Sequence, residues 1–351
     1  MGMINVVYLY SRLQPSVITI INELVKMQNI NVYVFYWDNS AYSAYKPPEI
    51  DNVKYFKKSD YDNSTLYKNV ANLNPHILYV SGWMDKTYLS VCKNLRRKCK
   101  IPIIAGSDTK WMGGKQWINV IISPWLQRKC FSHIQVAGVW QYEYARRLGF
   151  SKNQILMHNL SADVALFNKV DIESKADNYP KRFIYSGSLI PLKGLRFLVE
   201  AWKKIKNKNG WELMLIGNGP EKDHLLIEDD IKIIDFSSQD QLCYHLQNSG
   251  CFILPSLREQ WGVVLHEAAS AGLPILASDI CGAVPYFVLN NYNGITFRPG
   301  SAEQIKMTLE KIINASEDDL LEMAYNSRKL SIKITPEIVA RTLLSVLQDK
   351  K

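Results

Sequence analysis

The chain has 351 residues, of which 47% are hydrophobic and 21% charged, and its formal net charge is +9. This length exceeds what one ordinary core accommodates and predicts two domains, while the composition excludes a disordered chain. The basic charge favours anionic partners such as phosphorylated metabolites, nucleic acid or acidic lipid headgroups.

The cysteines and the apolar runs predict the cellular compartment of the protein. The six cysteines are scattered without C-x2-C spacing, which favours buried, reduced thiols in a reducing compartment. The N-terminal run reaches Arg12 too early for a signal-peptide core. No apolar run approaches the roughly 18 to 20 residues of a membrane span. We therefore expect a cytoplasmic protein, soluble or peripheral at the inner face of the cell membrane.

In the first half, strand-like runs rich in Val, Ile and Tyr alternate with periodic helical segments. The strand candidates are INVVYLY, VYVFYW, HILYVSG, IPIIAGS and HIQVAG, and the helix candidates cover about 17–27, 86–99 and 142–148. The alternation is typical of βαβ units and a parallel sheet.

The second half repeats this plan. Its strand candidates are RFIYSGS, WELMLIG, IKIIDF, CFILPS and PILAS, and its helix candidates cover 195–206, 221–227, a segment ending near 248, one starting near 262, and 302–314. Continuous apolar strands favour a sheet that is covered on both faces.

The pattern therefore predicts an α/β protein with two doubly wound, Rossmann-like halves. We expect a first domain over 1–168 and a second over 169–333, with a ligand cleft at the carboxyl ends of their strands. The last segment, 334–351, is predicted to be a helix, and the pattern leaves open whether it crosses back to the first half.

Two strand-to-helix turns in the second half are candidates for binding an anion. In YSGSLIPLKG, Gly187 and Ser188 allow backbone N–H groups to approach a ligand, and Lys193 adds a full positive charge. In LIGNGP, Gly217 and Gly219 form a similar turn. Either stretch could also be an ordinary turn, since glycine and proline are common in turns.

The stretch LREQWGVVLHEAASAGLP, 257–274, places two glutamates around the start of a helix. Glu259 lies in the loop after a buried strand, and the amides of 262–264 open the helix and suit a diphosphate. Glu267 lies more than a turn into the helix and could hold two adjacent ribose hydroxyls. The alternative is that Glu259 is a solvent-exposed loop residue and that Glu267 lies on the solvent-exposed face of a helix.

Taken together, these stretches resemble the retaining glycosyltransferases of family 4, which have the GT-B fold of two facing Rossmann-like domains. The similarity covers about 183–305, in the family's order and roughly its spacing. It is carried by YSGSLIPLKG, LMLIGNGP, LPSLREQWGVVLHEAASAGLPILASDICGAVP and NGITFRPGSAEQI. The stretch 159–167 is similar to the family's interdomain Asn/Asp-x3-Phe segment, with one residue inserted.

The resemblance implies transfer of a sugar from a nucleotide-diphosphate donor, UDP or GDP, with retention of anomeric configuration. Glu267 would bind the ribose, Glu259 the donor sugar, and Lys193 the diphosphate, together with the amides of Gly262, Val263 and Val264. No metal and no further cofactor is expected. The acceptor would be a saccharide or a lipid-linked saccharide in the synthesis of a surface polysaccharide or glycoconjugate; no acceptor-binding residue can be named.

Some positions depart from the family pattern. The family usually has Arg where this chain has Ser188, so another cation must serve the phosphates, with Arg258 and Arg12 as candidates. A histidine of the first domain often touches the donor sugar, and Asp108 is at what corresponds to that strand end. We therefore count Asp108 with Lys193 and Glu259 as a catalytic candidate.

Other features allow a structural and a functional interpretation. Asp60-x-Asp62 resembles a metal-binding pair but is better explained as a turn or helix cap. The basic run 93–102 could face anionic lipid, and a solvated helix face is an equal alternative. His266 is expected to be a packed residue. Four tryptophans could stack on sugar or prenyl chains, and core packing should account for at least two: Trp111, Trp117, Trp125 and Trp140.

Two other functions remain open. A nucleotide-sugar-binding GT-B protein without turnover would explain the missing Arg at Ser188, and a GT-B epimerase would use the same donor site. Nucleic-acid binding would require a recognisable basic module, and the chain shows none.

Overall fold

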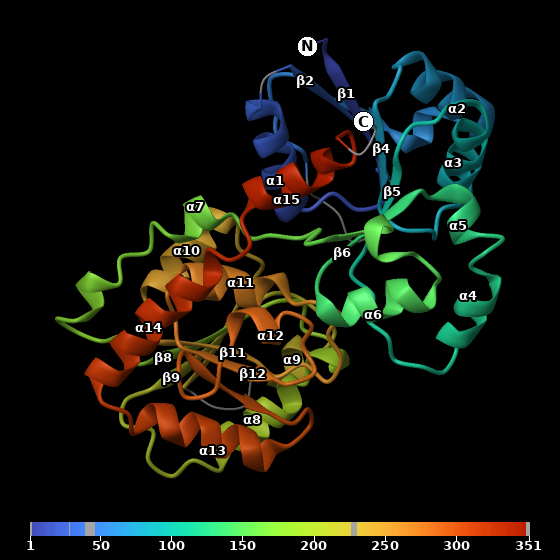
Figure 1. The fold of residues 1–351 in the computed structure, drawn as a ribbon. Helices are drawn as coiled ribbons and strands as arrows, with labels where there is room; N and C mark the ends of the chain where they lie inside the picture. Colours follow the sequence, from blue (N-terminus) through green and yellow to red (C-terminus); the bar gives the residue numbers. More distant parts are fainter. Residues whose placement is uncertain (1, 28, 39–45, 226–229, 349–351) are drawn as a thin grey trace. The chain divides into compact units, whose positions relative to one another are not determined.

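A computed structural model of the chain describes residues 2–27, 29–38, 46–225 and 230–348. The chain divides into two compact units: unit 1 is Met1–Ser161 with Pro336–Lys351, and unit 2 is Ala162–Thr335 (Figure 1). The expected boundaries, after 168 and after 333, therefore differ from the observed divisions by a few residues.

Unit 1 is built on a parallel sheet that, within the described residues, has seven strands in the order β3-β2-β1-β4-β5-β6-β7. The strands are β1 (Ile4–Tyr10), β2 (Ile30–Tyr36), β3 (Val53–Lys57), β4 (Ile77–Val80), β5 (Ile103–Ser107), β6 (His133–Val136) and β7 (Ile155–Met157). Their Val, Ile and Leu side chains form the core, as their continuous apolar runs predicted.

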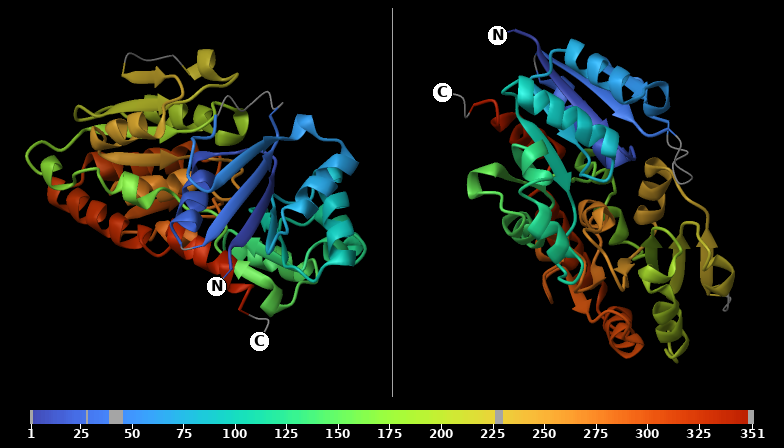
Figure 2. Two further views of the ribbon diagram at one scale, coloured as in Figure 1. Left: turned by 90° about the horizontal axis from the view of Figure 1, so that it is seen from above. Right: turned by 90° about the vertical axis from the view of Figure 1, so that its right-hand side faces the viewer.

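Helices cover both faces of this sheet, with α1 on one face and α2 and α3 on the other (Figure 2). The helices of unit 1 are α1 (Pro15–Lys26), α2 (Asn63–Asn72), α3 (Lys86–Lys98), α4 (Gln116–Ile122), α5 (Gln127–Cys130), α6 (Val139–Arg147) and α15 (Pro336–Ser345). The last of these, α15, packs against α1 within unit 1.

The Asp60-x-Asp62 pattern is a helix cap, as interpreted from the sequence. The Asp62 carboxylate accepts hydrogen bonds from the backbone N–H groups of Ser64 and Thr65, at 2.8 and 2.7 Å, at the start of α2. These bonds satisfy backbone donors that the helix leaves unpaired, and they lower the pKa of Asp62.

Unit 2 has a parallel sheet with six strands among the described residues, in the order β10-β9-β8-β11-β12-β13. They are β8 (Arg182–Ser186), β9 (Glu212–Ile216), β10 (Ile231–Ile234), β11 (Cys251–Leu254), β12 (Ile275–Ser278) and β13 (Gly294–Phe297). From β8 the chain first adds strands on one side and then, from β11 on, on the other. The strand order therefore reverses between β8 and β11.

The helices of unit 2 are α7 (Val164–Phe167), α8 (Leu195–Lys203), α9 (Lys222–Leu225), α10 (Gln239–Gln247), α11 (Val263–Ser270), α12 (Val284–Phe287), α13 (Ala302–Ile313) and α14 (Glu317–Ser331). The 15-residue helix α14 was not predicted; it packs against α11 and α12. The end of the helix expected over 221–227 lies outside the described residues. The two parallel-sheet units confirm the predicted doubly wound α/β class.

The thiols agree only in part with the sequence interpretation. All six cysteines are free, and four of them are buried, but Cys243 is half-buried and Cys99 is exposed. Cys99 directly follows α3, where the helix ends at the surface. No helix in the described part of the chain is long and apolar enough to cross a membrane.

Candidate donor site

Three loops that follow neighbouring strands of unit 2 meet at the carboxyl edge of its sheet. Strand β8 lies between β9 and β11, so the loops after these three strands are adjacent. The order reverses between β8 and β11, and in open parallel sheets ligands bind beside such a reversal. The fold therefore brings together the glycine-rich turns and the glutamate loop that the sequence singled out.

The loops after β8 and β9 are joined through their backbones. Leu189 N–H donates to the Asn218 carbonyl at 2.9 Å, and Glu221 N–H donates to the Leu189 carbonyl at 3.0 Å. Within the first loop, Tyr185 Oη donates to the Ser188 carbonyl at 2.9 Å. Gly217 packs so closely that a Cβ there would lie 1.9 Å from the Gly187 carbonyl oxygen, with φ at +146°. A side chain cannot be accommodated at this position.

The loop after β11 brings Glu259 to Lys193. Leu257 N–H donates to the Leu192 carbonyl at 2.9 Å, which ties this loop to the turn containing Lys193. Lys193 Nζ then lies 2.5 Å from Glu259 Oε2. The side chains are 20% and 15% exposed, so the pair is partly shielded but reachable by a ligand.

Helix α11 opens toward the same edge without a side-chain cap. Gly262 at its N-cap has φ at +94°, in the left-handed region, and no side chain accepts from the first turn. Gly262, Val263 and Val264 are half-buried. Since the first amides of a helix have no partner within the helix, this end suits an anion.

Glu267 and His266 on α11 have different surroundings. Glu267 is half-buried, and its carboxyl group is bonded to no described side chain or backbone group; burial raises its pKa to about 7. His266 is fully buried: Nδ1 accepts from Ala162 N–H at 2.9 Å, which leaves Nε2 to donate to the Ser331 carbonyl at 2.9 Å. It also stacks on Phe287. His266 is therefore a packed residue, as expected. Of these two side chains, only that of Glu267 makes no hydrogen bond within the described residues.

The family comparison agrees with this geometry. Residues 167–330 match the model of the glycosyl transferases group 1. The matched segment is therefore similar to a group 1 glycosyltransferase domain. It lies entirely within unit 2 and contains all three loops of the site.

Curated proteins similar to the chain are named as glycosyltransferases. The amylovoran biosynthesis glycosyltransferase AmsK of Erwinia amylovora is 25% identical over 61% of this chain and 55% of its own length. The capsular polysaccharide biosynthesis glycosyltransferase CapM of Staphylococcus aureus is 26% identical over 46% of this chain and 42% of its own. The chain spans about half the length of the curated relatives it matches. The recognition of a glycosyltransferase is confirmed.

Solved structures show the same fold across both units. A Rickettsia africae glycosyltransferase aligns with a TM-score of 0.76 at 12% identity, covering 99% of each chain. The Anabaena protein HepE, solved with UDP and glucose, aligns with a TM-score of 0.75 at 14% identity, covering 98% of this chain and 99% of its own. The predicted GT-B fold is thereby confirmed.

The remaining predicted residues fall into two groups. Within unit 2, Ser188 and Arg258 are exposed on the loops of the site. Arg258 N–H faces the Leu192 carbonyl at 3.3 Å, so this arginine lies on the same edge as Lys193. Asp108 and Arg12 are exposed residues of unit 1, in the loops after β5 and β1.

Of the four tryptophans singled out from the sequence, only Trp111 packs against the core cluster of unit 1, whereas at least two were expected to pack in the core. Trp111 is half-buried against Tyr144, with ring centroids 5.8 Å apart, and Trp140 is half-buried beneath the Lys110 ammonium. Trp117 and Trp125 are more than half exposed.

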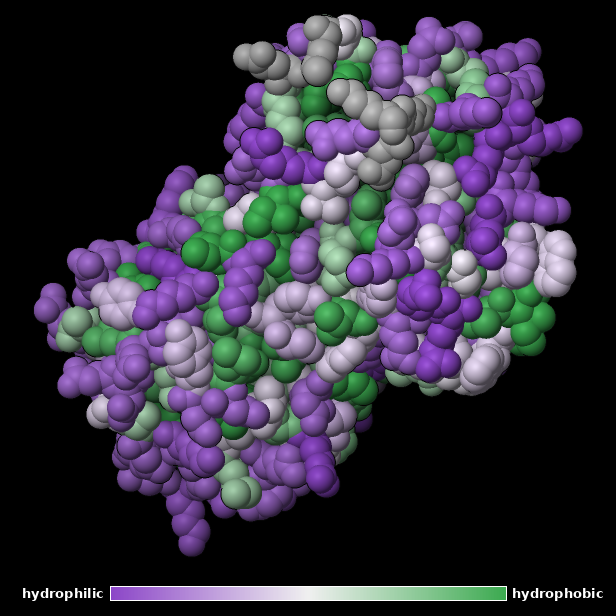
Figure 3. Space-filling model, in the orientation of Figure 1, coloured by the Kyte–Doolittle hydropathy of each residue, from purple (hydrophilic) through white to green (hydrophobic). Residues whose placement is uncertain are grey.

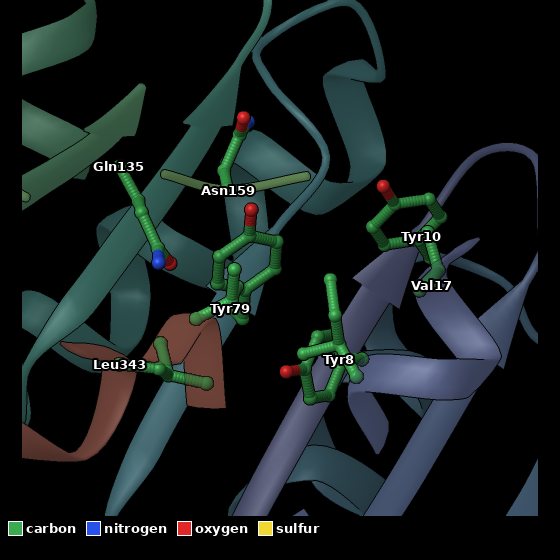
Figure 4. A pocket seen from close by; sticks show the side chains of 9 residues that line it. Tyr8, Tyr10, Val17, Tyr79, Gln135, Asn159 and Leu343 are labelled. Atoms are coloured by element: carbon green, nitrogen blue, oxygen red, sulfur yellow. The ribbon is translucent and has the colours of Figure 1, made fainter. Parts of the chain in front are cut away.

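Unit 1 also contains a small pocket that sequence analysis missed. Tyr8 and Tyr10 of β1 and Tyr79 of β4 line it together with Asn159 (Figure 4). The rings of Tyr8 and Tyr79 are 5.0 Å apart, and burial raises the pKa of all three tyrosines. The alternation of Tyr8 and Tyr10 placed both on one sheet face, but their pairing with Tyr79 required the strand order.

Proposed function

We propose that the chain transfers a sugar from a nucleotide-diphosphate donor, UDP or GDP, to a saccharide or lipid-linked saccharide, with retention of anomeric configuration and without a metal ion. The observation that carries this proposal is the Lys193–Glu259 pair on the strand-order reversal of a glycosyltransferase domain, followed on α11 by the unpaired carboxyl group of Glu267.

Each group has a distinct role in the proposed reaction. Lys193 Nζ and the first amides of α11 bind the diphosphate, whose negative charge grows as the bond to the sugar breaks. Glu259 accepts hydrogen bonds from the hydroxyls of the donor sugar. The Lys193–Glu259 contact places both groups at one point of the site, and binding of the donor would divide them between phosphate and sugar. Arg258 is the proposed replacement for the arginine absent at Ser188.

Glu267 is the proposed ribose-binding residue. Two adjacent hydroxyls can donate to one carboxylate, and this interaction favours the ionised form. Since burial raises the Glu267 pKa to about 7, nucleotide binding should draw the carboxyl group toward ionisation and release a proton near neutral pH.

The comparisons support this class of reaction. Curated relatives are named for amylovoran and capsular polysaccharide biosynthesis, and a similar fold has been solved with UDP and glucose. We propose a role in surface polysaccharide or glycoconjugate synthesis on the cytoplasmic side of the membrane.

The alternative is a nucleotide-sugar-binding protein without turnover, or an epimerase acting on the same donor. Ser188 favours the non-catalytic alternative because it removes one phosphate-binding cation. The complete set of Lys193, Glu259 and Glu267 favours catalysis.

Calorimetric titration with UDP, GDP, ADP and their sugars tests the donor site first. We expect micromolar binding of one nucleotide and its weakening by about tenfold or more in Glu267→Gln, because hydrogen bonds to a charged group are lost. Glu322→Gln, an exposed helical glutamate of α14, is the matched control.

Sugar transfer is then measured with the nucleotide sugar that binds and a panel of saccharide and lipid-linked acceptors. Binding without transfer, hydrolysis or epimerisation would favour the non-catalytic alternative. Failure to bind any nucleotide would exclude both.

A further inference from the structure

Helix α4 of unit 1 and the turn that follows it present large apolar side chains to solvent. Ile121 is 65% exposed, Trp125 63% and Ile118 59%, and no residue of α4 is buried. We call this surface the α4 patch; it consists of Trp117, Ile118, Ile121, Ile122 and Trp125. Apolar side chains gather where Figure 1 places α4, at the right-hand edge of the space-filling view (Figure 3).

The polar side chains of the same segment point into the protein. Asn119 Nδ2 donates to Tyr144 Oη at 3.2 Å, and the fully buried Ser123 Oγ donates to the Leu148 carbonyl at 2.7 Å. Gln116 bonds to the backbone on both sides of Trp111, donating to Lys110 O and accepting from Met112 N–H. Hydrogen bonds and the packing of Val120 against the core thus hold α4 with its polar side chains inward, while most of its apolar side chains face outward. This is the reverse of a helix that faces water.

The charged residues of the segment that contains the patch are all basic, and the first acid after it, Glu143, is ion-paired with Arg147. From 109 to 142 the sequence contains no Asp or Glu, while its charged residues are Lys110, Lys115, Arg128 and Lys129. Helix α5 packs against α3, where the buried Cys130 Sγ donates to the Leu89 carbonyl at 3.9 Å. The exposed face of α3 adds Lys93, Arg96 and Arg97.

We propose that the α4 patch docks on an anionic lipid bilayer. Tryptophan and isoleucine would enter the interface between headgroups and acyl chains, and the basic residues of α3 and α5 would face the lipid phosphates. A second copy of the chain fits less well, since two surfaces of the same positive charge would repel each other. This inference does not depend on the proposed transferase activity.

Vesicle sedimentation of the full chain tests the docking surface. We expect binding to vesicles of equal parts phosphatidylglycerol and phosphatidylcholine that is at least about tenfold tighter than binding to pure phosphatidylcholine. Ile121→Glu should weaken binding to the anionic vesicles by at least about tenfold, because a charge would replace an apolar side chain that enters the bilayer interface. Met307→Glu is the matched control, since Met307 is a 52% exposed apolar residue on α13 of unit 2.

A second variant tests the electrostatic part separately. Lys115→Gln with Lys129→Gln should weaken anionic-vesicle binding by about tenfold and reduce its dependence on salt. Calorimetric titration with the nucleotide tests the other site, so that a failure of lipid binding and a failure of the proposed function can be told apart.

The proposal is overturned if the wild type stays in the supernatant with anionic vesicles, or if Ile121→Glu sediments like the wild type. Analytical ultracentrifugation adds a further outcome. A concentration-dependent dimer that Ile121→Glu abolishes, without vesicle binding by the wild type, would show that a second copy covers the patch.

Discussion

The two units share a parallel-sheet scaffold but differ in the loops at its carboxyl edge. In unit 2, these loops carry glycines that allow close backbone approach, together with the Lys193–Glu259 pair. In unit 1, a tyrosine-lined pocket lies between the strands and helices α1 and α15, and an apolar helix is exposed elsewhere on the surface. The scaffold therefore determines where a ligand can bind, and the loops determine which chemistry is available.

The largest expected effect comes from filling the closest backbone approach in unit 2. In Gly217→Ala, the new Cβ would lie 1.9 Å from a carbonyl oxygen, and we expect a loss of about 3 kcal/mol or more in the free energy of unfolding. Gly113→Ala of unit 1, with φ at +72° and no atom within 4 Å, should cost only about 1 kcal/mol. Urea unfolding measures the free energy of unfolding of both variants. Equal losses would contradict the expected difference between the two glycine positions.

The next largest effect concerns catalysis at the unit 2 edge. We expect Lys193→Ala to lower kcat by about 100-fold or more, because a preorganised cation near the leaving phosphate is lost. Lys204→Ala, an exposed lysine paired with Glu200 after α8, should leave kcat unchanged. Steady-state kinetics with the identified donor checks both variants, and similar kcat values would remove Lys193 from the mechanism.

The titration of Glu267 predicts a pH-dependent nucleotide affinity. Ribose hydroxyls donate to the ionised carboxylate, so affinity should rise with pH through about 7 and then level off. Isothermal titration from pH 5.5 to 8.5 measures this slope, which Glu267→Gln should abolish. A wild-type slope of opposite sign would exclude the ribose role.

The same carboxyl group should reduce stability at high pH. Its pKa is raised in the folded state, so its protonated form favours folding, and this contribution is lost as pH rises from about 4.5 to about 7. At pH 8, Glu267→Gln should therefore be more stable than the wild type by about 1 to 3 kcal/mol. Urea unfolding at pH 5 and pH 8 checks the sign; a variant no more stable at pH 8 would show that the carboxylate is compensated in the folded protein.

The smallest effect is expected at Asp108 of unit 1. We expect Asp108→Asn to lower kcat by about tenfold and to leave nucleotide affinity unchanged, because this exposed side chain is proposed to contact the sugar and not the nucleotide. Asp51→Asn, an exposed acid just before β3, serves as the control. A loss of nucleotide affinity in Asp108→Asn would change its proposed role.

Much of the fold followed from local pattern, because the spacing of apolar residues reports directly on strands and helices. Helices α3 and α13 begin where they were predicted and end one residue early. Helix α14 was missed, and the exposed helix α4 was missed as well, since QWINVII is short and rich in β-branched residues, which is equally typical of a strand. Hydrogen bonds from Asn119 and Ser123 to residues far along the chain hold α4 in place, and these are invisible in a local window.

The sequence by itself determined the two parallel-sheet halves, the glycine turns and the identity of the charged groups in the donor site. Only the tertiary structure decided that Lys193 meets Glu259, 66 residues away, because that contact depends on β8 and β11 being neighbours. It also decided that burial raises the Glu267 pKa to about 7 while both ring nitrogens of the adjacent His266 are bonded. Composition and periodicity report on neighbouring residues in the sequence. Ion pairs and pKa values depend instead on which distant residues the fold brings together and on how far they exclude water.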